Sequence, residues 1–214
     1  MVGGPKDQKL DTIYAMWLIR GGGHNILSVK KLAGVQPEQI TDIVVSHAHW
    51  DHMGGIDLFP NAIIWIQKEE FRYYTGEAWQ AGGDHGGIDP EDVQALVRLN
   101  TEGRVRLIVG DNVEIFPGIR AYTGGRHTYA SPYLLVEGTP RFVLASDNTY
   151  LYRNLETHIA SATFSDADHA ANIKNQERMI QLAGSIDRVI PGHDALQFQK
   201  FPTQGRVATL KAPQ

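Results

Sequence analysis

Cysteine is absent from the 214-residue sequence. This absence excludes disulfide bonds, thiolate metal ligands and thiol nucleophiles. A metal site in this chain would therefore have to be built from imidazole and carboxylate groups.

Long apolar runs are absent as well. No stretch approaches the roughly 20 residues that a membrane-spanning helix needs. The first eleven residues are polar and contain no apolar stretch of signal-peptide length. We therefore expect a cytoplasmic protein without a membrane partner.

Neither sign of charge forms a block. Twenty Lys and Arg stand against 24 Asp and Glu, which gives a formal net charge of -4. Nucleic acids and anionic membranes are recruited by concentrated positive charge, so we expect neither as a partner. The expected partner is a small-molecule ester or lactone substrate, and the sequence leaves a homodimer open.

What the sequence does contain is a series of short apolar, β-branched and aromatic runs, most of them bounded by Gly, Pro, Asn or Asp. Such runs predict strands. The expected strands are residues 13–19, 42–45, 62–66, 105–109, 113–122, 133–136, 141–145 and 188–190. Residues 137–140 predict a hairpin turn, and Pro117-Gly118 predicts either a turn or a bulge within its run.

Two helices are expected between these strands. One begins after the capping residue Asp89 and ends at Gly103, and the other covers residues 165–184. The residues expected to face inward are Val93, Leu96 and Val97 in the first helix, and Ile173, Ile180 and Ala183 in the second. Strands and helices mixed in this order predict an α/β fold of layered sheets with helices outside. We expect residues 1–214 to form a single domain.

The densest chemical signal is the segment His47-Ala48-His49-Trp50-Asp51-His52, which follows the apolar run Ile43-Val44-Val45. If the segment is extended, His47 and His49 point the same way and can bind one ion, while Asp51 and His52 can reach a second. Histidines on loops are often structural, but three imidazoles and a carboxylate in one turn favour a dinuclear metal site.

Further ligands are expected where other strands end. His127, Asp147 and His193 each follow a strand-like run and precede a loop. Taken singly, each residue is more often structural. Together with the histidine-rich segment, they form a consistent ligand set.

The order of these residues resembles the metallo-β-lactamase superfamily, whose pattern is HxHxDH, then His, then Asp, then His. The resemblance implies an αββα sandwich of the metallo-β-lactamase type. It also implies that His47, His49 and His127 hold a first metal ion, that Asp51, His52 and His193 hold a second, and that the Asp147 carboxylate bridges them.

Two features resemble quorum-quenching N-acyl homoserine lactonases in particular. Residues 192–201 match the ending GHD-x-x-x-F-x-x-[FY], and residues 147–150 match D-x-x-Y, in which the Tyr faces the substrate. Two other branches fit less well. The zinc β-lactamases most often studied use a Cys ligand, which this sequence lacks, and the flavodiiron oxidases usually replace the second His of the motif, which is His49 here. One departure is that the stretch after Leu27 lacks the usual Asp-Thr-Gly-like turn. Either the chain is shortened there or the sequence omits disordered residues.

The resemblance implies a dinuclear metal-dependent hydrolase in which a hydroxide shared by two ions opens a lactone ring of the N-acyl homoserine lactone kind. Zinc is the first choice, and imidazole and carboxylate donors also accept Mn, Fe or Co. Tyr150 would stabilise the oxyanion, and Asp51 would carry the proton to the leaving alkoxide.

The alternatives are a thioesterase of glyoxalase II type, an arylesterase, a phosphotriesterase or a β-lactamase of the same fold. A non-catalytic metal-binding fold is a further alternative. Structural zinc sites are usually mononuclear and rich in cysteine, which favours catalysis here.

The remaining histidines are not assigned to the site. His24, His85, His158 and His169 are expected to be surface or supporting groups. The glycine-rich residues 82–87 predict either a mobile lid or a solvated connection. Tyr73, Tyr74 and Trp79 are considered for a role as aromatic residues that face the substrate. Trp50 and Met53 are expected either to line the pocket or to pack beneath the metal loop.

Overall fold

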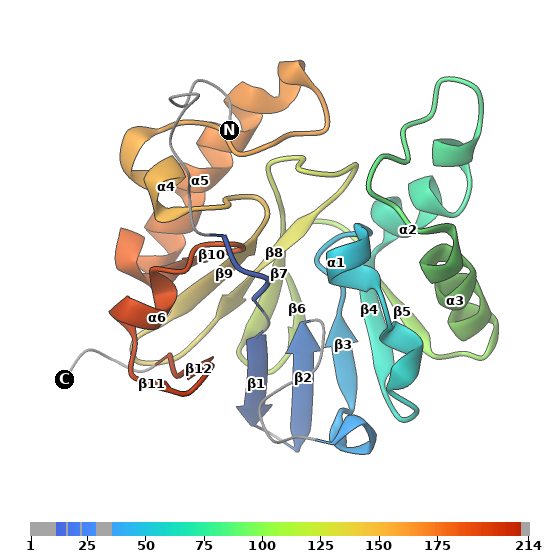
Figure 1. Ribbon diagram of the computed structural model, residues 1–214, viewed down its shortest axis with the longest axis horizontal. Coiled ribbons are helices and arrows are strands. Elements are labelled where there is room, and N and C mark those ends of the chain that lie inside the picture. Colours follow the sequence, from blue (N-terminus) through green and yellow to red (C-terminus); the bar gives the residue numbers. More distant parts are fainter. Residues whose placement is uncertain (1–11, 16, 22, 29–35, 211–214) are drawn as a thin grey trace. The chain divides into compact units, whose positions relative to one another are not determined.

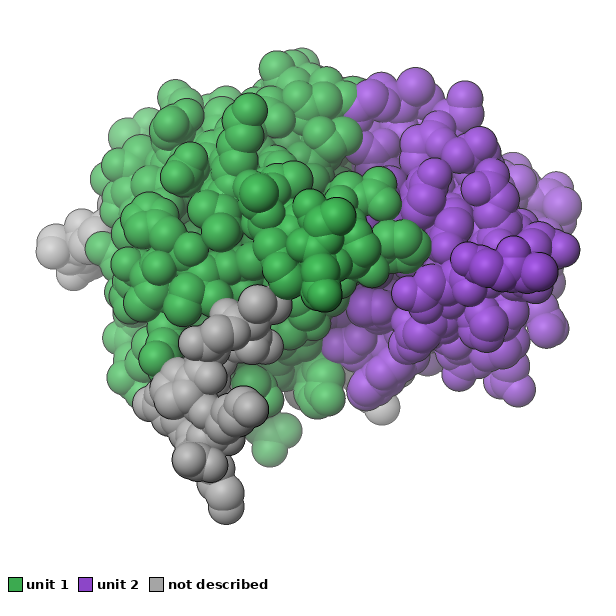
Figure 2. Space-filling model, turned by 90° about the horizontal axis from the view of Figure 1, so that it is seen from above, with its two compact units in different colours: residues 1–15, 111–127, 131–214 green, residues 16–110, 128–130 purple. Residues whose placement is uncertain are grey.

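A computed structural model describes residues 12–15, 17–21, 23–28 and 36–210 (Figure 1). The chain divides into two compact units, coloured separately in Figure 2. Unit 1 comprises residues 1–15, 111–127 and 131–214, and unit 2 comprises residues 16–110 and 128–130. The expectation of one domain over residues 1–214 stays a prediction.

Unit 2 contains a five-stranded sheet in the order β1-β2-β3-β4-β5. Its strands are β1 (Trp17–Gly21), β2 (His24–Ser28), β3 (Asp42–Val44), β4 (Ile63–Gln67) and β5 (Val105–Ile108). β1 and β2 form an antiparallel hairpin, whereas β2, β3, β4 and β5 are parallel to one another. Parallel neighbours need crossover connections, and these carry the helices of the unit.

The helices of unit 2 are α1 (Trp50–Met53), α2 (Lys68–Tyr74) and α3 (Pro90–Thr101). α2 packs on β4, and α3 packs on β5. Helix α3 begins as expected, with the side chain of Asp89 accepting a hydrogen bond from the amide of Glu91. Leu96 and Leu99 are fully buried, but Val97 is 40% exposed, so its expected inward position is wrong.

Unit 1 contains a second five-stranded sheet, in the order β10-β9-β8-β7-β6. Its strands are β6 (Val113–Phe116), β7 (Ile119–Thr123), β8 (Pro132–Val136), β9 (Phe142–Ser146) and β10 (Val189–Pro191). β6 to β9 form antiparallel hairpins, and β10 adds to β9 in parallel. The short strands β11 (Thr203–Gln204) and β12 (Val207–Ala208) pair separately.

The helices of unit 1 are α4 (Tyr152–Thr157), α5 (His169–Ala183) and α6 (Gln197–Lys200). α5 covers β9 and β10 (Figure 1) and ends at Gly184, whose φ of 79° lies in the left-handed region that favours glycine. Its most buried residues are Asn172, Gln176, Met179 and Ala183. Ile180 packs against the core from a partly buried position.

Most expected strands are confirmed to within a residue or two. Pro117-Gly118 forms a turn that divides the run 113–122 into β6 and β7, rather than a bulge inside one strand. The expected strand 13–19 is wrong over residues 13–15, because this segment is not in the sheet and Ile13 bonds to the backbone of His193 instead. Strand β2 and the short helices α1, α2, α4 and α6 were not expected.

Two expectations fall on residues that the structure does not describe. The polar N-terminal stretch 1–11 lies outside the described residues, and so do residues 29–35, where the shortened segment after Leu27 is expected. Within the described part of the chain, no helix is long and apolar enough to cross a membrane.

Candidate metal centre

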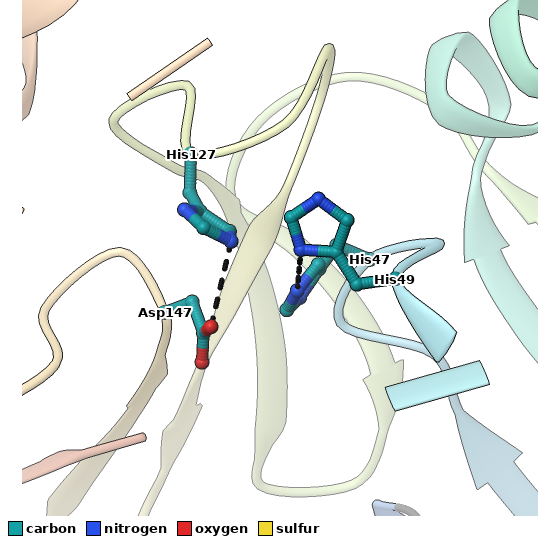
Figure 3. Close-up of side chains that lie close together, drawn as sticks. All are labelled: His47, His49, His127 and Asp147. Carbon is teal, nitrogen blue, oxygen red and sulfur yellow. Dashed lines mark hydrogen bonds and ion pairs between the residues drawn. The ribbon is translucent and has the colours of Figure 1, made fainter. Parts of the chain in front are cut away.

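In unit 2, four potential ligands follow the end of β3. The segment after Val44 leaves the sheet as a loop, and His49 becomes the residue that precedes α1. Asp51 and His52 then lie on this short helix. The segment is therefore a loop and a helical turn, although the expected meeting of His47 and His49 occurs, with Nε2 of His47 3.0 Å from Nδ1 of His49 (Figure 3).

The second pair of this motif is also in contact. Nε2 of His52 lies 3.3 Å from a carboxylate oxygen of Asp51. The rings of His47 and His52 are 3.9 Å apart between centroids. The Ser46 hydroxyl lies 3.3 Å from Nδ1 of His47 and 3.2 Å from Nδ1 of His52. One hydroxyl therefore contacts the back of two imidazoles, and the Nε2 atoms face away from it.

In unit 1, two histidines converge on one carboxylate. Asp147 follows β9, and one of its carboxylate oxygens lies 3.4 Å from Nε2 of His127. Nε2 of His193 lies 3.0 Å from both carboxylate oxygens. Figure 3 draws the His127–Asp147 contact of unit 1 and the His47–His49 contact of unit 2 as dashed lines.

Backbone carbonyl groups determine the tautomers of these two histidines. Nδ1 of His127 donates to the carbonyl of Ala162 at 2.9 Å, and Nδ1 of His193 donates to the carbonyl of Ile13 at 2.6 Å. A carbonyl oxygen can only accept, so Nδ1 carries the proton and Nε2 of a neutral ring presents a lone pair.

These lone pairs face a carboxylate, which also offers only lone pairs when ionised. A cation between them relieves that repulsion. Metal-binding histidines commonly have this arrangement, in which the other ring nitrogen donates to a carbonyl. The donor chemistry of unit 1 therefore fits a divalent metal ion.

The backbone is in an uncommon conformation immediately before two of these ligands. Arg126 and Ser146 have φ values of 55° and 48°, in the left-handed region that non-glycine residues rarely adopt. Such positions cost about 1–3 kcal/mol each and persist where the surroundings enforce them. Gly192, before His193, has a different constraint, since a Cβ there would lie 2.5 Å from a carboxylate oxygen of Asp147.

A buried amide network enforces these conformations, and the sequence reading missed it. The Asn148 side chain accepts hydrogen bonds from the Gly125 amide and the Ser131 hydroxyl. The Asn172 side chain on α5 donates to the carbonyls of Gly125 and Asn148. Asn148 and Asn172 are fully buried. Glycine at 125 is required by close approach, because a Cβ would lie 2.6 Å from the Asn172 amide nitrogen.

The sequence reading also missed Glu70 on α2, whose carboxylate accepts a hydrogen bond from the amide of Ala48 at 3.0 Å. Burial, and then the charge of Glu70, raises the pKa of the neighbouring Tyr74 well above its usual range, so this phenol stays protonated. Tyr73 and Tyr74 are themselves buried. An acidic residue in the sequence Lys68-Glu69-Glu70 carries no local signal that one carboxylate is buried and its neighbour exposed.

Tyr150 lies beside two ligand candidates of unit 1, and its expected catalytic role stays a prediction. Its ring centroid is 5.4 Å from that of His127 and 5.2 Å from that of His193, both in edge-on orientation. The backbone carbonyl of Tyr150 accepts the amide hydrogen of His193. Tyr150 is therefore held beside two of the three ligand candidates of this unit.

The remaining histidines have other partners. His24 contacts Asp42 at 2.8 Å, and His85 contacts the Ala78 carbonyl at 3.0 Å. His158 ends α4 in a left-handed conformation, and His169 lies 3.6 Å from Asp166. Within the motif itself, Met53 is fully buried, and Trp50 is 50% exposed.

The glycine-rich residues 82–87 form hydrogen bonds to other parts of unit 2. The Gly87 carbonyl accepts from the Trp50 amide at 3.0 Å, and the Tyr73 hydroxyl accepts from the Asp84 amide at 2.9 Å. A Cβ on Gly87, whose φ is 74°, would lie 3.0 Å from the His49 ring. This stretch therefore packs directly on a ligand candidate of unit 2.

Comparison with known proteins identifies the family of the chain. A sequence model of the metallo-β-lactamase superfamily matches residues 11–193. The chain belongs to the metallo-β-lactamase superfamily. The matched range contains every expected metal ligand, and the expected α/β fold of this superfamily is confirmed.

Curated relatives in the superfamily are lactonases. The N-acyl homoserine lactonase of Bacillus cereus is 30% identical over 175 residues, which cover 80% of this chain and 63% of that protein. A Bacillus sp. enzyme of the same name is 28% identical over 174 residues, with the same coverage of 80% and 63%. The chain thus spans less than two thirds of the length of these relatives.

Solved structures lead to the same part of the superfamily. A variant of AiiA from B. thuringiensis, with N-decanoyl-L-homoserine bound at its active site, has a TM-score of 0.63 at 25% identity and covers 79% of this chain and 62% of its own. A quorum-quenching N-acyl homoserine lactone lactonase has a TM-score of 0.69 at 21% identity, with coverage of 87% and 81%. The second likeness shows the fold alone.

Proposed function

We propose that this protein is a metal-dependent hydrolase that opens a lactone ring of the N-acyl homoserine lactone kind. The observation that carries the proposal is the set of donors in the chain, in which His127 and His193 both direct Nε2 at the Asp147 carboxylate. Membership of the superfamily and the names of the relatives support the same reading.

The proposed ligands are those that the sequence predicts. His47, His49 and His127 would hold one divalent ion, Asp51, His52 and His193 would hold the other, and Asp147 would be shared by the two. Contacts within each unit support this assignment, with His47 beside His49 in unit 2 and both His127 and His193 beside Asp147 in unit 1. Zinc is the first candidate, and Mn, Fe or Co are compatible with the same donors.

Bound ions of this kind would lower the pKa of coordinated water toward neutrality and would polarise a carbonyl group. The chain's own residues then complete the reaction. The Tyr150 hydroxyl donates to the substrate carbonyl oxygen as that atom gains charge. The Asp51 carboxylate takes a proton from the attacking water and delivers it to the ring oxygen as the ester bond breaks, which yields the hydroxy acid.

The proposal is tested by a substrate panel with the wild type and Tyr150→Phe. The panel contains acyl homoserine lactones, a simple γ-lactone, aryl esters, a glutathione thioester, a β-lactam and a phosphotriester. We expect lactones to be preferred, and Tyr150→Phe to lower their turnover roughly ten- to a thousandfold, up to the loss caused by removing one oxyanion donor. Metal content should not change, because Tyr150 is not a ligand.

Each alternative has its own outcome in the same assay. A wide preference for the thioester, aryl ester, β-lactam or phosphotriester would replace the lactone with that substrate and keep the hydrolase. A silent Tyr150→Phe variant would remove Tyr150 from the mechanism. Two metal equivalents without turnover of any substrate would overturn the enzyme reading and favour a metal-binding fold.

A further inference from the structure

Helix α2 places one carboxylate entirely inside unit 2. Glu70 has no exposed surface. One of its oxygens accepts hydrogen bonds from the Ala48 amide at 3.0 Å and from the Thr128 hydroxyl at 2.7 Å, and the other accepts from the Ala130 amide at 2.7 Å. Burial of a charged group is costly, and donors arranged around it are what allow a carboxylate to remain there.

The donors belong to the segments that carry expected metal ligands. Ala48 separates His47 from His49, and Thr128 directly follows His127 in the chain. Glu70 is therefore in contact with both segments through hydrogen bonds to a charged acceptor, which are about twice as strong as neutral ones.

A second side chain of α2 contacts the same turn. The ring of Tyr73 stacks on that of Tyr129, with centroids 4.1 Å apart and planes 4° apart. The turn 128–130 is thus fixed on α2 by the Thr128 hydroxyl, the Ala130 amide and the Tyr129 ring. These contacts leave the backbone of the turn little freedom to move relative to Ala48.

We propose that Glu70 is a positioning residue of the metal centre. It fixes the peptide of Ala48, between His47 and His49, relative to Thr128, the residue that follows His127. The inference rests on the proposed function, because His47 and His49, on either side of Ala48, are ligands proposed for the first ion. Glu70 acts through the backbone and is not itself a ligand in this proposal.

Only a carboxylate suits this position. All three groups that the cited bonds bring to Glu70 are donors. A glutamine has nearly the same shape but carries an NH2 group in place of one acceptor oxygen. Glu70→Gln would therefore set a donor against the Ala130 amide or against the Ala48 and Thr128 pair.

The test is a titration of the metal-free protein with Co²⁺, followed by visible absorbance, for the wild type, Glu70→Gln and Glu69→Gln. We expect Glu70→Gln to weaken Co²⁺ binding 10- to 100-fold, the usual effect of removing an outer partner of a metal ligand. Glu69 is the matched control, since its side chain is 52% exposed and ion-paired with Arg72 on the surface. Its variant should bind Co²⁺ as the wild type does.

A purely structural role would give a different pattern. It would lower the thermal unfolding midpoint of the metal-free protein and leave the Co²⁺ affinity within twofold of the wild type, which would overturn the inference.

If Glu70→Gln does not fold, Thr128→Val and Thr128→Ser decide the question. We expect the valine variant, which lacks the hydroxyl donor, to weaken Co²⁺ binding and the serine variant to restore it, and equal affinities would overturn the inference.

The titration also separates this inference from the proposed function. Wild-type protein that binds no Co²⁺ would overturn both. Wild-type protein that binds Co²⁺ and hydrolyses lactones, beside a Glu70→Gln variant of equal affinity, would leave the proposed function in place and remove only the positioning role of Glu70.

Discussion

Asp147 is the residue on which the ligand candidates of unit 1 depend. Both oxygens of its carboxylate lie close to imidazole nitrogens, at 3.0 Å from His193 and, for one oxygen, 3.4 Å from His127. Its side chain is almost fully buried. A cation shared with the two rings would stabilise an ionised carboxylate in that position.

We predict that Asp147→Ala loses metal retention and hydrolase activity together. The substitution removes the negative charge and the shared ligand, so the effect on affinity should exceed the 10- to 100-fold loss typical of outer partners. Metal analysis after dialysis and turnover of the preferred substrate measure the two effects. His169→Ala is the control, because His169 contacts exposed Asp166 and should change neither quantity. An Asp147→Ala protein with two metal equivalents and near-normal turnover would refute the assignment.

Sequence alone identified the residues whose chemistry is concentrated locally. The imidazoles and carboxylate of residues 47–52 are conspicuous because four donors fall within six positions. Glu70, Asn148 and Asn172 could not be identified in that way. Most of their partners are backbone groups, and these lie up to 60 residues distant in the chain, as in the Glu70 bond to Ala130. A polar residue gives no local indication of such a partner.

At the scale of elements, strands composed of β-branched residues were predictable, and short or polar elements were not. β3 and β4 read as continuous apolar runs because parallel strands are buried on both faces. β2 begins with His24 and Asn25, and α2 is only seven residues long, so neither shows a full period. The prediction of a strand over residues 13–19 was wrong at its start, because the Ile13 amide bonds to the backbone of His193. The pattern of side chains gives no indication of such a backbone bond.

The fully buried polar residue of helix α5, Asn172, contacts the loops that carry ligand candidates of unit 1. Besides its bonds to Gly125 and Asn148, the Asn172 side chain accepts from the Ser161 amide at 3.0 Å. The helix thus holds the loops that carry His127 and Asp147. The inward residues expected on apolar periodicity, Ile173 and Ile180, are only partly buried.

We predict that Asn172→Ala lowers the free energy of unfolding by about 2–3 kcal/mol, because it leaves buried backbone groups without a partner. Chemical denaturation of the metal-free protein measures this loss. Asn175→Ala on the same helix is the matched control, since its side chain bonds to the Ala171 carbonyl at the surface, and it should change stability by less than about 0.5 kcal/mol. Equal effects of the two substitutions would show that the Asn172 network adds no stability.

At the scale of the whole molecule, the proposed ligands are spread along most of the chain. The first, His47, belongs to unit 2, and the last, His193, belongs to unit 1. An unfolded chain does not hold residues so far apart in one coordination sphere. Metal binding should therefore favour the folded state over the unfolded state.

We predict that removal of metal lowers the thermal unfolding midpoint of the wild type and that re-addition restores it. A ligand present at a hundred times its dissociation constant stabilises the folded state by about 2.7 kcal/mol, which corresponds to a shift of roughly 5–10 °C for a protein of this size. Scanning calorimetry of chelated and Zn²⁺-reloaded samples measures the shift. The shift should be retained in His169→Ala and reduced in Asp147→Ala, because only the second change removes a ligand. A midpoint that does not respond to chelation or reloading would contradict the proposed metal centre.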